Sequence, residues 1–118
     1  MGERRYMIFH TEIFTLENLW DKIVEQEGKN FLTKKGLPFT YTIKGGELFT
    51  DRRERSITRS TFEKAYEKLL RDQVGENAPK KIVGPKTLNV YGAPYVWAVF
   101  TGIGMIDEEL YIQEEMHF

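Results

Sequence analysis

The sequence predicts an α+β fold, in which a β-hairpin and short strands form one small domain with two or three helices. Two segments show the three- and four-residue apolar spacing of amphipathic helices. A third alternates aromatic or branched residues with threonine and then reaches a Gly-Gly pair. With 118 residues, 41% of them hydrophobic and 30% charged, the chain has the size and composition of a single domain that spans residues 1–118.

The first elements are a strand and a helix. Tyr6 to Phe9 is a short apolar run that predicts a strand. A helix follows over about residues 16–27, with Thr15 as its N-cap and Gly28 as its stop. Phe14 and Leu19 occupy the positions of a hydrophobic staple around that cap. The apolar stripe of this helix consists of Leu16, Leu19, Trp20, Ile23 and Val24.

Residues 39–52 predict a β-hairpin. Residues 39–43 alternate in the period of a strand, and Gly45-Gly46 suits a two-residue turn because glycine tolerates φ > 0. This turn sets the register, which pairs Lys44 with Glu47, Ile43 with Leu48, Thr42 with Phe49 and Tyr41 with Thr50.

A second amphipathic helix is predicted from about Arg59 to Asp72. Its stripe comprises Phe62, Ala65, Tyr66, Leu69 and Leu70. Two starts compete: Thr58 as N-cap, with Ile57 and Phe62 as a staple, or a capping box of Ser60 and Glu63.

The remaining segments are less distinctive. Residues 73–86 predict a loop, Thr87 to Tyr91 a short strand and Leu110 to Ile112 a closing strand. Pro94 to Ile106 has strand-like residue types, but Pro94 suits the first turn of a helix and Gly102 its end, which favours a short buried helix. In either form this segment is apolar on all sides and belongs in the core.

The familiar catalytic and metal-binding patterns are missing from the sequence. There is no cysteine, and His10 and His117 stand at opposite ends of the chain, so we expect no metal and no cofactor. Ser56 and Ser60 both precede or start a helix, where capping alone explains them. Asp51 follows a strand and is interpreted as part of a surface ion pair. We therefore name no catalytic residue, and whether the protein is an enzyme stays open, with the balance against it.

Apolar runs are too short for a membrane helix of about 18 residues or for a signal peptide, so we expect a cytoplasmic protein without a membrane partner. The net charge is −1, but its distribution is uneven. Residues 33–71 hold ten Lys or Arg and five Asp or Glu, a net charge of +5, and Lys80, Lys81 and Lys86 follow. Residues 107–118 hold five acidic residues and no Lys or Arg, a net charge of −5. The two charges are expected on different faces.

The basic stretch includes a run of arginines and hydroxyl residues at the start of the second predicted helix. Free backbone N–H groups and the positive end of the helix dipole favour anions there, and Arg, Ser and Thr are common phosphate contacts. The same Ser and Thr residues also suit simple capping of the helix. The candidate nucleic-acid-binding residues are Arg52, Arg53, Arg55, Arg59, Ser60, Thr61, Lys34 and Lys35.

Residues 57–69 carry a local resemblance. The run Thr58-Arg59-Ser60-Thr61-Phe62, with Ala65, Tyr66 and Leu69 beyond it, resembles the recognition helix of GntR-like winged-helix regulators. The resemblance implies that Arg59 and Thr61 meet DNA, as in a small bacterial-type regulator. We carry over these two residue roles and not the fold.

Three hypotheses remain open. The first is a nucleic-acid-binding domain with DNA or RNA as its partner, in which basic residues neutralise phosphates and Phe39 or Tyr41, if exposed, stacks on a base. The second is an interaction or structural module that forms a homodimer through sheet edges or the apolar segment 95–106. The third is a small enzyme.

Overall fold

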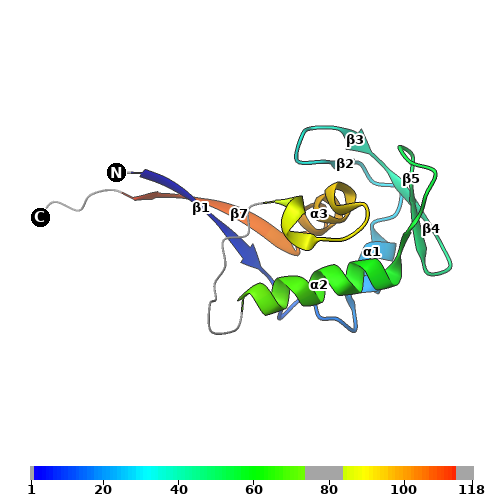
Figure 1. Cartoon of the computed structure of the whole chain (residues 1–118), viewed down its shortest axis with the longest axis horizontal. Helices are drawn as coiled ribbons and strands as arrows, with labels where there is room; N and C mark the ends of the chain where they lie inside the picture. Colours follow the sequence, from blue (N-terminus) through cyan, green and yellow to red (C-terminus); the bar gives the residue numbers. More distant parts are fainter. Residues whose placement is uncertain (1, 74–83, 114–118) are drawn as a thin grey trace, which may run out of the picture.

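The computed structural model describes residues 2–73 and 84–113, and it confirms the predicted α+β class. In this part of the chain, three α-helices and a 3₁₀-helix combine with short antiparallel strands (Figure 1). The elements are β1 (Gly2–Phe9), α1 (Leu19–Glu25), β2 (Phe31–Leu32), β3 (Pro38–Phe39), β4 (Tyr41–Lys44), β5 (Glu47–Thr50), β6 (Ile57–Thr58), α2 (Arg59–Gln73), η1 (Pro85–Leu88), α3 (Ala93–Gly102) and β7 (Ile106–Gln113).

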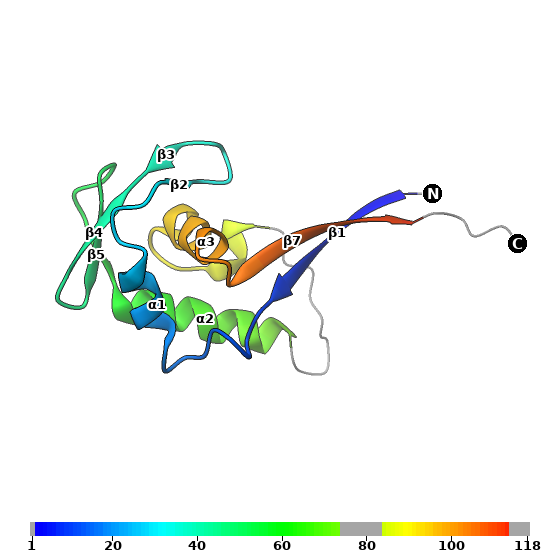
Figure 2. The same cartoon turned by 180° about the vertical axis from the view of Figure 1, so that it is seen from behind.

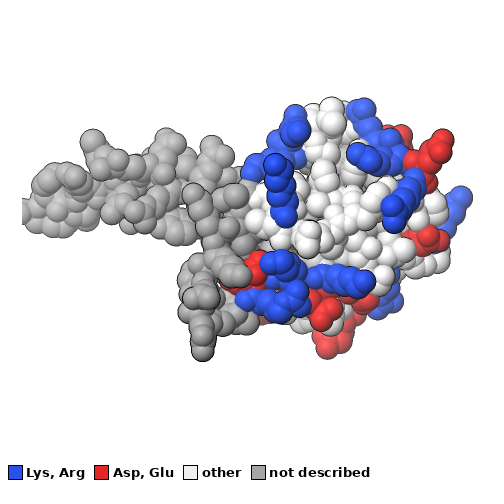
Figure 3. Space-filling view, in the orientation of Figure 1, with Lys and Arg blue, Asp and Glu red and all other residues white. Residues whose placement is uncertain are grey.

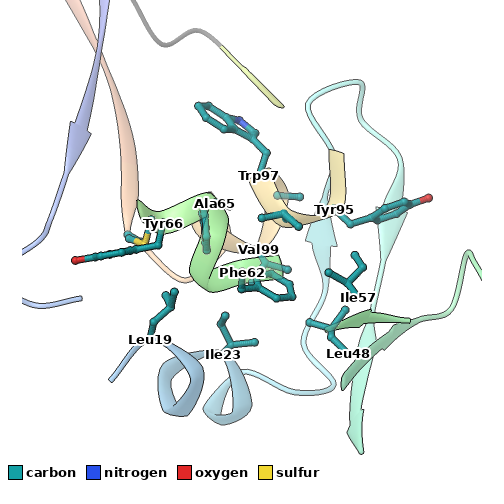
Figure 4. Close-up of a cluster of buried hydrophobic side chains, with 14 of the residues drawn as sticks. Leu19, Ile23, Leu48, Ile57, Phe62, Ala65, Tyr66, Tyr95, Trp97 and Val99 are labelled. Atoms are coloured by element: carbon teal, nitrogen blue, oxygen red, sulfur yellow. The ribbon is translucent and has the colours of Figure 1, made fainter. Parts of the chain in front are cut away.

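Helix α3 is the centre of the core, and it confirms the short buried helix that was expected to start at Pro94 and end at Gly102, whereas Ile106 begins β7. Pro94 stands in its first turn, and every residue from Tyr95 to Phe100 is buried. A helix that is apolar on all sides needs neighbours all round. Figure 1 shows α3 between α2 and the β2–β3 hairpin, and Figure 4 shows side chains of α1, α2 and β5 gathered beside it. Phe62 of α2 packs between α3 and α1. Its ring centroid lies 6.0 Å from that of Phe100 in α3 and 5.9 Å from that of Trp20 in α1.

The predicted hairpin forms in the predicted register. Strands β4 and β5 pair Lys44 with Glu47 and Tyr41 with Thr50, and β6 extends the sheet along β5. At the turn, Gly45 has a φ of 60°, whereas Gly46 does not enter the positive region. Burial raises the pKa of the Tyr41 hydroxyl, which stays protonated and donates a hydrogen bond to the carbonyl of Ile23 in α1. The hairpin is thereby fixed to the helical layer.

The first helix is shorter than predicted, because it begins at Leu19 and not at residue 16. Thr15 and Asn18 form a reciprocal pair: the amide of Thr15 donates to Asn18 Oδ1 at 2.9 Å, and the amide of Asn18 donates to Thr15 Oγ1 at 3.3 Å. This reciprocal bonding has the geometry of a capping box at Thr15, the predicted N-cap, and residues 16–18 form a turn that leads into the helix. Leu16 and Val24, predicted in the apolar stripe, are exposed.

The second helix agrees with its prediction to within one residue, and it starts after Thr58. The amide of Thr61 donates to Thr58 Oγ1 at 3.3 Å, which is the N-cap geometry, and the staple residues Ile57 and Phe62 are both buried. Of the two competing starts, the structure therefore adopts the Thr58 cap.

The strand predicted over residues 87–91 is wrong. Residues 85–88 form the 3₁₀-helix η1, and Asn89 follows with a left-handed φ of 51°. Pro85 at the helix start and Asn89 at its end are typical of a short helical turn. Most of the loop predicted over residues 73–86 lies outside the described residues.

The terminal strands are longer than predicted and pair with each other. Strands β1 and β7 are antiparallel, with Gly2 opposite Gln113 and Phe9 opposite Ile106. Figure 2 shows this two-stranded ribbon projecting from the globule. His10 lies at its base, where its Nε2 is 2.6 Å from Asp107 Oδ2.

A close contact positions the β2–β3 hairpin against α3. Gly102, the last residue of α3, faces the ring of Phe31, and a Cβ at this glycine would lie 2.3 Å from Phe31 Cδ2. The left-handed residue that ends the helix is Gly104, with a φ of 90°. Gly102 is therefore required for a close approach between a helix and a strand rather than for its φ.

We predict that Gly102→Ala lowers the free energy of unfolding by about 1–3 kcal/mol, because the added methyl group overlaps the Phe31 ring. Chemical denaturation measures this loss. Gly46→Ala is the matched control, since its Cβ would meet nothing closer than 4.0 Å. Equal stability of the two variants would contradict the close contact.

Candidate functional site

The start of α2 is stabilised by its own side chains and by the hairpin turn. Thr58 Oγ1 lies 3.0 Å from Ser60 Oγ and 2.9 Å from Thr61 Oγ1. The amide of Arg59 donates to the carbonyl of Gly46 at 2.8 Å, and Arg59 Nε donates to Glu63 at 3.2 Å. The amides of Arg59 and Thr61 and the guanidinium of Arg59, which lie where an anion was expected, thus already have partners within the protein.

The arginines before α2 turn toward α3. The guanidinium carbon of Arg55 lies 3.8 Å from the centroid of the Tyr91 ring, and that of Arg53 lies 5.6 Å from the centroid of Tyr95. Both are cation–π contacts. Arg52 instead donates from Nε to the carbonyl of Pro38 at 2.8 Å. These three arginines are therefore spread along the β3 and α3 side of the molecule and do not gather around the start of α2.

A groove of about 490 Å³ lies between the β2–β3 turn and η1. We call it the basic groove. Its charged lining residues are all cationic, and no acidic side chain lines it among the residues that the structure describes. The lining residues are Thr33, Lys34, Lys35, Leu37, Arg53, Gly84, Pro85, Lys86, Thr87, Pro94 and Tyr95.

The hairpin wall of the groove is a tight, well-bonded turn. The amide of Thr33 donates to the carbonyl of Leu37 at 2.9 Å, and the amide of Leu37 donates to Thr33 Oγ1 at 3.0 Å. Gly36 has a φ of 87°, which glycine adopts without strain. The turn therefore holds Lys34 and Lys35 at its tip.

The opposite wall is η1. Thr87 Oγ1 donates to the carbonyl of Gly84 at 2.6 Å, so its hydrogen is used to close this turn. The side chain of Lys34 crosses to this wall, because a Cβ at Gly84 would lie 2.8 Å from Lys34 Nζ. Glycine at this position leaves space for the ammonium group between the two walls.

Several acidic groups near the basic stretch are bound elsewhere. Asp51 accepts a hydrogen bond from the amide of Thr40 at 3.1 Å, a backbone contact in place of the predicted ion pair, and Glu47 accepts one from Ser56 at 2.6 Å. Figure 3 shows Lys and Arg side chains bordering an uncharged area, with acidic side chains mainly at the right and lower margins. A hydrogen bond to Tyr95 raises the pKa of Arg53. In the described part of the chain, the groove is thus lined by cationic and apolar side chains.

Three of the predicted site residues, Lys34, Lys35 and Arg53, meet in this groove. Arg52 and Arg55 bind other parts of the same side, and Arg59, Ser60 and Thr61 remain at the α2 start. Lys86 was not predicted as a site residue, although it was noted after the basic stretch. Its place opposite Lys34 depends on how η1 folds back, and no local pattern signals that.

The described residues were also compared with the requirements of a metal site and of a membrane-spanning helix. Among residues 8–72 and 84–107, whose side chains the structure describes, no three or more His, Cys, Asp or Glu side chains converge to hold a metal ion. Within residues 2–73 and 84–113, no helix combines the length and apolar character needed to cross a membrane.

No protein-family model, curated protein or solved structure matches this chain. The resemblance of residues 57–69 to a GntR-like recognition helix therefore stays a prediction, and the site rests on its geometry alone.

We predict that Thr58→Ala lowers the free energy of unfolding by about 1 kcal/mol, because it removes the N-cap of α2. We expect the affinity for anions to stay unchanged, since Thr58 does not line the basic groove. Thermal denaturation and an anion titration measure the two effects. Lost anion affinity with unaltered stability would restore the helix start as the binding site.

Proposed function

We propose that this domain binds nucleic acid through the basic groove. The observation that carries the proposal is the convergence of Lys34, Lys35, Arg53 and Lys86 on one groove without an acidic lining residue in the described part of the chain. Four like charges held together repel one another and attract a ligand that carries several negative charges. A phosphodiester backbone is such a ligand.

The residue types suit phosphate. Lys35 and Lys86 provide compact charges for phosphate oxygens, and the guanidinium of Arg53 offers a planar set of donors. Arg52 and Arg55 extend the positive surface beyond the groove.

The overall charge of −1 gives the molecule no general attraction for nucleic acid. Non-specific attraction by the whole molecule is weak at such a charge. The affinity therefore has to come from the cations that line the basic groove, and single substitutions of these residues test it.

We predict that Lys35→Ala and Lys86→Ala each weaken binding to a labelled oligonucleotide. We also expect each to flatten the plot of log affinity against log salt by about 0.7, the slope that one phosphate contact of a single strand contributes. Fluorescence anisotropy over a salt series measures both quantities.

Lys44→Ala is the matched control for this experiment. It removes the same charge from the β4–β5 turn, outside the groove lining. If this variant loses as much affinity as Lys86→Ala, binding follows net charge and not the groove, and the proposal fails.

A second candidate is a homodimer formed through the β1–β7 ribbon. These two strands form a sheet of their own among the described strands, and a two-stranded ribbon is marginally stable alone. The backbone groups along its outer edges suit pairing with a second copy. The apolar segment that we had considered as an interface is a poor one, because Tyr95 to Phe100 is buried in the core.

We predict for this candidate a concentration-dependent monomer–dimer equilibrium in sedimentation experiments. A single monomeric species at all concentrations would exclude it.

A further inference from the structure

We infer that the basic groove receives one unpaired nucleotide, so that the domain prefers single-stranded over double-stranded nucleic acid. This inference deepens the proposed function and rests on it. It concerns which form of nucleic acid fits the groove, whereas the proposed function requires only that phosphates bind there.

The shape of the groove supports this choice. Its volume of about 490 Å³ lies within the range of pockets that enclose one small molecule, about 300–1,000 Å³. A duplex is a convex cylinder whose bases are stacked inside, and proteins read it with elements that protrude into its grooves. A concave site instead suits a base that has left the stack.

The groove also has apolar side chains in its lining, which the binding of a phosphate alone does not require. Beside the four cations, the apolar lining is formed by Leu37, Pro85 and Pro94, while Tyr95 is only 7% exposed and lies beneath Arg53. Inorganic phosphate or a duplex backbone gains nothing from apolar walls. The flat face of a nucleobase buries apolar area against such walls while its phosphate reaches the lysines.

Arg53 connects the two parts of the site. Its guanidinium lies over the ring of Tyr95, and the side chain is exposed to solvent. The Tyr95 hydroxyl points away from the core cluster in Figure 4. Guanidinium planes serve as stacking surfaces for unpaired bases, so Arg53 supplies both a charge and a planar contact.

Simple electrostatics makes the opposite prediction. A duplex has a higher charge density than a single strand, so a site that only attracts phosphates binds the duplex at least as tightly. A preference for the single strand at equal salt would therefore report on the base and not on charge.

The first experiment compares a short single strand with a duplex of the same sequence, in DNA and in RNA, by fluorescence anisotropy at one salt concentration. We expect the single strand to bind at least about tenfold more tightly, the effect of roughly one stacked base. A nucleoside monophosphate should likewise compete more strongly than inorganic phosphate.

The second experiment uses two exposed leucines of the same hairpin. Leu37 lines the groove and is 49% exposed, whereas Leu32 is 63% exposed and is absent from the lining. Leu37→Ala should weaken single-strand binding about fivefold through lost apolar contact. Leu32→Ala should leave it unchanged, and neither substitution should alter duplex binding.

Each outcome is decisive. A single-strand preference that Leu37→Ala reduces supports the inference. Equal or tighter duplex binding, or equal competition by inorganic phosphate, overturns the inference and leaves the proposed function standing. Failure of both nucleic-acid forms to bind overturns the proposed function itself, together with the inference.

Discussion

The burial of α3 is the constraint on which the rest of the structure depends. Its residues from Tyr95 to Phe100 have no polar face to offer to water, so the chain has to surround them. Helix α2 contributes Phe62 on one side, and β2 contributes Phe31 on the other. Much of the apolar surface that this small protein buries on folding therefore lies around one helix.

Covering α3 also creates the positive side of the molecule. Tyr91 and Tyr95 lie one turn apart before and within the start of α3, and each lies beneath an arginine of the segment that leads to α2. These contacts draw Arg53 and Arg55 away from the α2 start, which Thr58 caps without them. An anion site was expected at the end of the helix. Arg53 instead lines the basic groove, and Arg55 lies over Tyr91 outside the groove lining.

The basic groove combines four segments of the chain: the β2–β3 turn, Arg53, η1 and the start of α3. The two turns are held by local bonds between Thr33 and Leu37 and between Thr87 and Gly84. The close contact between Gly102 and Phe31 then sets the β2–β3 hairpin relative to α3. The site is thus formed by packing, with lysines at the tips of two rigid turns.

Local patterns determined much of the secondary structure. The hairpin register follows from a glycine pair between alternating strands, and the start of α2 follows from a threonine with a staple, because both depend on neighbours within a few residues. The first helix begins at Leu19, three residues later than the apolar periodicity predicts, and a turn over residues 16–18 precedes it. Only the tertiary structure placed Lys86 across the groove from Lys34, and Arg53 and Arg55 over Tyr95 and Tyr91. These placements depend on how α3 is buried. Such long-range packing leaves no local pattern in the sequence.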